Sequence, residues 1–242
     1  MRAADVLRAL GPIDLASVRR DPLLRWMGVI PVALALGFRW GVPWVESEGL
    51  ELERYRPLLA SIVLLTTPMI YGAVIGFLLL DERDDGTLTA LRVTPLTVTG
   101  YLAYRIAVPC LLSIAMSVVA LQLSGQSRPG LLRQALAAVA VAPLAPAFAL
   151  FLAAYARNKV QGFALMKAAG VVNWPPLIAW FVDPPAQWLF GLCPTYWPAK
   201  LAWELEQGAG VSALWLFPIC VLVLSGLVAL LLRRFDRVLR RD

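Results

Sequence analysis

The sequence predicts an all-α membrane protein with six transmembrane helices. Three observations lead to this fold class: 60% of the 242 residues are hydrophobic, only 16% are charged, and the apolar residues gather in runs of bilayer length. Soluble domains carry roughly 25% charged residues, and about 20 mostly apolar residues are needed to cross a bilayer. The length fits a single transmembrane domain over residues 1–242, with little left over for a soluble module.

Residues 1–22 are expected to form an amphipathic helix at the membrane surface. Its apolar face carries Ala3, Val6, Leu7 and Leu10, and its opposite face carries Arg2, Asp5 and Arg8. A basic polar face favours the cytoplasmic membrane surface. Gly11 and Pro12 are expected to break this stretch into two short helices. The alternative is a mobile, solvated N-terminus.

Six apolar runs follow that are long enough to span the membrane. They cover residues 23–42, 58–80, 101–123, 131–155, 160–182 and 211–232. Arg39 is expected to extend its charge to the far interface of the first span. Several spans contain proline, which membrane helices tolerate where neighbouring groups satisfy the freed carbonyls.

The distribution of lysine and arginine predicts that both termini are cytoplasmic. With the N-terminus inside, the inner segments carry fourteen basic residues, while the outer segments carry five: Arg54, Arg56, Arg128, Arg133 and Lys200. The other three, Arg39, Arg105 and Lys167, lie within spans. Cytoplasmic loops of membrane proteins carry an excess of basic residues, so the net charge of +6 indicates topology rather than binding of nucleic acid.

The outer segment 183–210 is unusually rich in aromatic residues and proline. Its aromatic residues are Trp188, Phe190, Tyr196, Trp197 and Trp203. Such side chains favour the headgroup level of a membrane, and the run Ala199–Gln207 is long enough for two helical turns. We interpret the segment as a re-entrant or interfacial hairpin before the last span. The alternative is an ordinary aromatic belt.

Residues 81–100 form a polar stretch between the second and third spans, predicted to be cytoplasmic. Gly86 can start a turn and Thr87 can cap a short helix. Leu88 and Leu91 then share one side of that helix, and Pro95 ends it. A short helix held between two spans is suited to press against a partner protein.

Several chemistries are absent from the sequence. The chain has no histidine, the commonest general base and metal ligand. It has no Gly-x-x-x-x-Gly-Lys-Ser/Thr loop to hold ATP phosphates, and its three cysteines have no metal-ligand spacing. We therefore expect neither an enzyme nor a cofactor bound by this chain, and energy for any uphill transport has to come from another subunit.

Residues 82–105 resemble the signature of the ABC-2 type exporter permeases. The positions that match the pattern are Glu82, Gly86, Thr87, Leu88, Leu91, Thr94 and Pro95, followed by Tyr101, Leu102 and the basic Arg105. The sequence departs from the pattern at Asp84, where the family usually has Glu, and at Thr89, where Glu is common. The specific motif covers about 25 residues, and the number of spans resembles the family more loosely. Length and the Pro194–Trp197 segment resemble actinobacterial drug export permeases, including fluoroquinolone exporters.

The resemblance implies a permease subunit of an ATP-driven exporter in the bacterial plasma membrane. Two permease subunits, identical or different, would pair, each docked on a separate ATP-binding subunit that holds ATP and Mg²⁺. The residues implied to contact the ATPase are Glu82, Asp84, Asp85, Gly86, Thr87, Leu88, Leu91, Thr94 and Pro95. The expected cargo is a drug or another amphipathic small molecule, with fluoroquinolone-type antibiotics among the candidates. The alternatives are export of a lipid or polysaccharide, or a scaffold subunit that transports nothing.

Polar residues inside two spans are candidates to line a substrate pathway. Thr67 and Tyr71 are four residues apart and share a helix face, and Asn173 and Trp174 lie in the fifth predicted span. The alternative is that these polar side chains join helices to one another.

Overall fold

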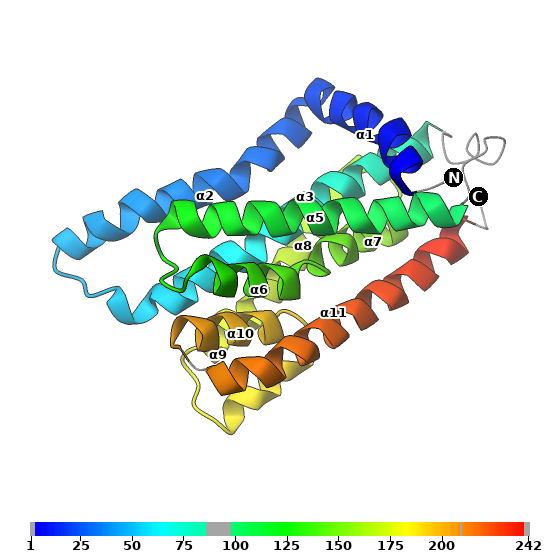
Figure 1. The fold of residues 1–242 in the computed structure, drawn as a ribbon. Coiled ribbons are helices and arrows are strands. Elements are labelled where there is room, and N and C mark those ends of the chain that lie inside the picture. The colour runs from blue at the N-terminus through cyan, green and yellow to red at the C-terminus, as the bar shows by residue number, and fades with distance from the viewer. Residues whose placement is uncertain (1–2, 86–97, 209, 240–242) are drawn as a thin grey trace.

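The protein is a bundle of helices (Figure 1). This computed structural model describes residues 3–85, 98–208 and 210–239, and the described part of the chain contains no strand. Within those ranges, five stretches are long and apolar enough to cross a membrane: Pro22–Ser47, Glu53–Asp84, Gly100–Ser124, Leu131–Tyr155 and Ser212–Arg237. The predicted all-α membrane class is confirmed, whereas a sixth span is not.

The N-terminal region forms two long helices, α1 (Ala3–Arg20) and α2 (Pro22–Ser47). The predicted break at Gly11–Pro12 is wrong, because α1 continues through Pro12. Pro12 is exposed, so the carbonyl that loses its helical partner can bond to solvent. The junction between α1 and α2 is capped by Asp21, whose Oδ1 accepts a hydrogen bond of 2.9 Å from the Leu23 amide.

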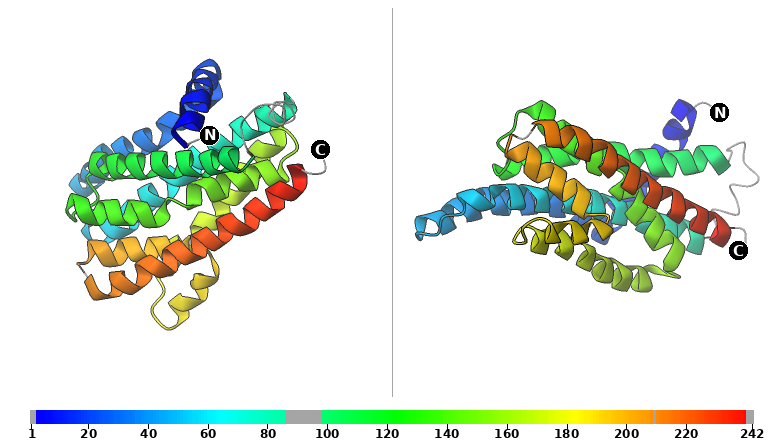
Figure 2. Two further views of the ribbon diagram at one scale, coloured as in Figure 1. Left: turned by 45° about the vertical axis from the view of Figure 1, so that its right-hand side comes forward. Right: turned by 90° about the horizontal axis from the view of Figure 1, so that it is seen from below.

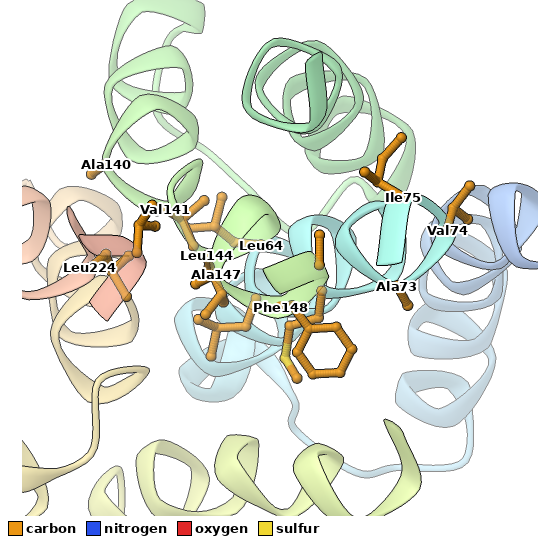
Figure 3. Close-up of a cluster of buried hydrophobic side chains, with 14 of the residues drawn as sticks. Leu64, Ala73, Val74, Ile75, Ala140, Val141, Leu144, Ala147, Phe148 and Leu224 are labelled. Atoms are coloured by element: carbon orange, nitrogen blue, oxygen red, sulfur yellow. The ribbon is translucent and has the colours of Figure 1, made fainter. Parts of the chain in front are cut away.

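Helix α3 (Arg56–Asp84) is the centre of the bundle and follows a short 3₁₀ turn, η1 (Glu53–Tyr55). It packs against α2, α5, α7 and α10. Two glycines let α7 approach closely: a Cβ at Gly72 would lie 2.3 Å from the Ala145 carbonyl oxygen, and one at Gly76 would lie 3.0 Å from Leu152 Cβ. Figure 3 shows apolar side chains of α3 and α7 that meet in this part of the core, including Leu64, Ala147 and Phe148.

The third and fourth predicted spans are present as helices α5 (Val98–Ser124), α6 (Leu131–Val141) and α7 (Leu144–Tyr155). The fourth span is divided into two helices at Ala142 and Pro143. Pro143 has no amide hydrogen, and Pro146 lacks the donor needed one turn later. The run 131–155, predicted as one span, is therefore divided into two helices by its prolines.

The fifth predicted span, 160–182, is interrupted. It consists of α8 (Lys159–Gly170), the 3₁₀ turn η2 (Val171–Asn173) and the short α9 (Trp174–Ala179). Pro175 and Pro176 stand in the first turn of α9 and cannot donate to the preceding carbonyls, which explains why the helix restarts there. This stretch is not among the five candidate spans.

The outer segment folds back onto the bundle before the last helix, α11 (Gly210–Leu239). It contains η3 (Ala186–Leu192) and α10 (Tyr196–Glu206), and α10 packs against α3, α6 and α11. The predicted helical run in this segment is present, but its aromatic residues do not form one belt. Tyr196 and Trp203 are buried, and Trp203 Nε1 donates to Ser61 Oγ at 3.1 Å, whereas Trp188 is half exposed.

The ends of the chain lie at the same end of the bundle. Figures 1 and 2 show the start of α1, the end of α3, the start of α5 and the end of α11 gathered there. We call this the inner end, after the prediction from the basic residues, and the opposite end the outer end. The side of the membrane that this end faces stays a prediction.

Candidate functional site

Arg105 is the most deeply buried charged side chain at the inner end, with only 1% of its surface exposed. It lies on α5 and forms a two-pronged ion pair with Asp14 of α1, with Nη1–Oδ2 and Nη2–Oδ1 distances of 2.8 and 3.2 Å. Its Nη2 also pairs with Glu82 at the end of α3. One guanidinium group therefore joins three helices.

Two tyrosines of α5 complete this group of charges. Tyr101 donates a hydrogen bond to the Glu82 carboxylate, and Tyr104 donates to Asp14 Oδ2 at 2.8 Å. Both rings also lie close to the guanidinium carbon of Arg105, at 5.3 and 5.4 Å from their centroids. We call these five residues the Arg105 cluster. A buried charge is tolerated only when it is paired and hydrogen-bonded, so the cluster ties α1, α3 and α5 to one another.

A second ion-pair group lies on the adjoining side of α3. Lys159, at the start of α8, contacts Asp21 Oδ2 at 2.8 Å and Asp81 Oδ1 at 3.0 Å. The hydrogen bond from Lys159 lowers the pKa of Asp21 below its ordinary value. Burial by itself would lower the pKa of Lys159, but its hydrogen bonds to the two carboxylates raise that pKa overall. This group joins the α1–α2 junction and α3 to α8.

Arg83 attaches the same end of α3 to the end of α7. Its Nη1 and Nη2 atoms donate to the carbonyl oxygens of Ala153 and Ala156, at 3.3 and 2.8 Å. These carbonyls belong to the last turn of α7, where helical partners run out. Three successive residues, Asp81, Glu82 and Arg83, thus bind α8, α5 and α7 respectively, directly before the segment predicted to contact a partner.

The structure places only three of the nine predicted contact residues. Glu82 points into the Arg105 cluster and is occupied by this chain's own groups, whereas Asp84 and Asp85 are exposed at the end of α3. The other predicted contact residues, Gly86, Thr87, Leu88, Leu91, Thr94 and Pro95, lie outside the described residues.

The four residues predicted to line a substrate pathway do not form one site. Thr67 is buried, and its hydroxyl donates to the Val63 carbonyl of its own helix at 2.8 Å. Tyr71 donates to the Gly28 carbonyl of α2 at 3.1 Å. This bond joins two helices, as the alternative describes, and contact of Thr67 or Tyr71 with a substrate stays a prediction. Asn173 is partly buried, and Trp174 is 62% exposed on α9.

An apolar pocket of about 410 Å³ lies between α3, α7, α8 and α11. Its walls include Met69, Phe148, Phe151, Ala169, Leu227 and Leu231. None of the four predicted pathway residues lines it. Its volume falls in the range of small-molecule sites, roughly 300–1,000 Å³.

Several residues of the site can be recognised in the sequence only with hindsight. An arginine in the first turns of an apolar span requires an acidic partner, which draws attention to Asp14 and Glu82 as well as Arg105. Lys159 directly precedes a predicted span, and a charge at that position also favours an acidic partner. The Gly72-x-x-x-Gly76 spacing on the second span is typical of two membrane helices in close contact.

Comparison with known proteins shows the family. The profile of the family described as "Fluoroquinolones export permease protein Rv2686c-like" matches residues 14–233. The chain is 35% identical over 205 residues to the fluoroquinolones export permease protein Rv2686c of Mycobacterium tuberculosis strain H37Rv, covering 81% of each chain. The protein MT2760 of strain CDC 1551 has the same description, identity and coverage.

No solved structure matches the chain significantly. The family model covers nearly the whole transmembrane bundle, and the spans of the structure agree with a multi-pass protein of the plasma membrane. The chain therefore belongs to the Rv2686c-like family of fluoroquinolone export permeases.

Proposed function

We propose that this chain is the permease subunit of an ATP-driven exporter that moves amphipathic drugs, including fluoroquinolones, out of the cell. In this proposal it pairs with a second permease subunit, and a separate ATP-binding subunit holds ATP and Mg²⁺ and hydrolyses the nucleotide. The family and its relatives are export permeases, which supports the export of drugs. The ABC-type partner follows from the resemblance of residues 82–105 to the ABC-2 signature.

The observation that carries the proposal is the attachment of the α3 end. Asp81, Glu82 and Arg83 connect α3 to α8, α5 and α7, immediately before the segment implied to dock on the ATPase. A loop that transmits force needs a firmly attached helix end. If the end of α3 were flexible, a displacement of the loop would bend that end and would not reach the other helices.

The mechanism follows from these connections. Closure of two ATP-binding subunits would push on the helix containing Leu88 and Leu91. Because the Arg105 cluster ties the end of α3 to α5 and α1, the push would move these helices together rather than bend the end of one. The permease would then alternate between inward- and outward-facing arrangements without binding nucleotide itself.

The test is ATP hydrolysis by the assembled complex. Replacing both Leu88 and Leu91 by Asp should remove the stimulation of ATPase activity by norfloxacin, because a charged side chain cannot occupy an apolar docking site without a large desolvation cost. The matched control is Leu50→Asp, an exposed leucine at the outer end of the bundle, which should leave the stimulation intact. Unchanged stimulation in the double variant would refute the proposed coupling. Failure to purify any ATP-binding subunit with the wild-type permease would refute the partnership.

A further inference from the structure

The apolar pocket between α3, α7, α8 and α11 has no role in the proposed coupling. Its lining is almost entirely apolar, and its one hydroxyl, that of Thr195, already donates to the Val172 carbonyl at 2.6 Å. The pocket therefore offers no free polar side chain to a ligand. It suits the hydrophobic body of a molecule, held by contact area rather than by hydrogen bonds.

The pocket exists because α8 is held at its two ends. At the inner end, Lys159 forms its two ion pairs, and Gly162 packs on Phe77, where a Cβ would lie 2.9 Å from the Phe77 ring. At the other end, the Val172 carbonyl accepts the hydrogen bond from Thr195. Between these anchors α8 presents Ala169, whose small side chain leaves the volume unfilled.

A row of aromatic rings runs from the pocket to the inner end along one face of α7. Phe148 and Phe151 line the pocket, with ring centroids 6.2 Å apart, and Tyr155 follows at 5.3 Å from Phe151. Tyr155 is 46% exposed. Aromatic rings at such distances offer faces and edges to a planar ligand, so the row forms a continuous aromatic surface from the pocket to the inner end of the bundle.

A positive charge marks the inner end of this row. The guanidinium carbon of Arg234, on α11, lies 5.4 Å from the centroid of the Tyr155 ring. Within the described part of the chain, Arg234 forms no ion pair. An anionic group of a ligand whose body fills the pocket could reach it. Arginine suits this role, because its planar fork matches a carboxylate.

We propose that this pocket binds a flat aromatic carboxylate that enters from the inner leaflet, with its ring system beside Phe148 and Phe151 and its carboxylate at Arg234. The inference rests on the proposed export function and adds to it the location of the binding site and a role for Arg234. It also assigns the site to a single permease subunit, so binding requires neither the second permease nor the ATPase.

The test measures binding by the purified full-length permease in nanodiscs of neutral phosphatidylcholine, without nucleotide or partner. The probes are norfloxacin, an aromatic carboxylate, and its ethyl ester, which lacks the acid. Ala169→Trp should fill the pocket and weaken binding of both probes by more than about tenfold, because it removes the volume that the rings occupy. Arg234→Gln should weaken the acid about threefold to fivefold, as expected for a partly solvated ion pair, and leave the ester unchanged. Arg234→Lys should retain most of the affinity for the acid.

Arg237→Gln is the matched control, because Arg237 is exposed one turn further along α11 and has no aromatic partner within the described chain. It should bind both probes like the wild type. If Ala169→Trp fails to give a monodisperse protein, Ala169→Leu provides a milder filling, with a smaller loss expected. Wild-type affinity for norfloxacin in either filled variant that folds would overturn the proposal. Equal weakening of acid and ester by Arg234→Gln would overturn the role of the charge.

A second arm separates a drug from a membrane lipid. Adding phosphatidylglycerol to the nanodiscs should leave norfloxacin binding unchanged if the pocket selects aromatic carboxylates. Competitive displacement by phosphatidylglycerol that disappears in Ala169→Trp would show an anionic lipid site and overturn the proposal. Because these assays contain no ATP-binding subunit, their failure would leave the coupling experiment with Leu88 and Leu91 unaffected.

Discussion

Replacing Arg105 by Gln should destabilise the permease more than any other single change at the inner end. Arg105 is 1% exposed and holds two carboxylates, those of Asp14 and Glu82. Removing one partner of a buried ion pair leaves the other charge unpaired and costs about 3–5 kcal/mol. For a chain of this length, such a loss corresponds to a fall in melting temperature of roughly 6–20 °C.

The assay is thermal unfolding of the detergent-purified protein, followed by size-exclusion chromatography of the fraction that remains folded. Arg39→Gln is the matched control, because Arg39 is exposed and makes only a long hydrogen bond of 3.5 Å to the Leu123 carbonyl. The control should shift the melting temperature by no more than about 1 °C, as for most surface changes. A fall of less than about 2 °C for Arg105→Gln would refute the reasoning, since it would mean that the cluster does not hold the three helices together.

An apolar replacement of the whole ion group separates stability from coupling. The triple variant Asp14→Leu, Glu82→Met, Arg105→Met should recover much of the lost stability, because a well-packed apolar group often equals a buried ion pair. Drug-stimulated ATPase activity of the complex should remain impaired if the specific geometry of the cluster transmits the movement of the loop. Full recovery of both properties would assign the cluster to stability alone.

Two further predictions concern the packing of α3 and the second ion group. Gly72→Ala should destabilise the bundle by about 1–3 kcal/mol or more, because the added Cβ would lie 2.3 Å from the Ala145 carbonyl oxygen; Gly28→Ala, with nothing within 4 Å, should be neutral or slightly stabilising in the same melting assay. The pKa of Asp21 is lowered in the folded protein, so its contribution is present above the unfolded pKa of about 3.9 and is lost as the pH falls through the folded pKa. The difference in melting temperature between wild type and Lys159→Met should therefore shrink as the pH falls below about 4; a difference that stays unchanged between pH 5 and pH 3 would contradict this assignment.

Much of the fold could be predicted because membrane spans have a strong composition signal. Five of the six predicted runs correspond to candidate membrane spans, although the run 131–155, predicted as one span, is divided into α6 and α7. The run 160–182 was predicted as a span because it is apolar and long enough to cross a membrane. It is not one continuous helix, because Pro175 and Pro176 interrupt it. At Gly11–Pro12 the sequence predicted a break that the structure does not have, since α1 continues through the exposed Pro12.

The candidate site was predicted as a segment but not as a set of contacts. The string from Glu82 to Pro95 identifies the loop and its family, since local spacing is sufficient for that. The partners of Glu82, however, are Tyr101 and Arg105, which lie 19 and 23 residues after it along the chain, and Arg105 also pairs with Asp14, 91 residues before Arg105. Polarity alone also does not show that the hydroxyls of Thr67 and Tyr71 donate to backbone carbonyls, and contact of these residues with a substrate stays a prediction.

The sequence by itself determined the membrane class, the helical content and the family, because all three depend on composition or on residues close together in the chain. Only the tertiary structure decided which charges pair, where α10 lies and that a pocket remains beside α8. These features depend on how closely helices approach, and the approach is set by small contacts such as Gly72 against Ala145. Whether a buried arginine is paired, and whether a cavity stays unfilled, depends on side chains that are distant in the sequence and become neighbours only in the folded protein.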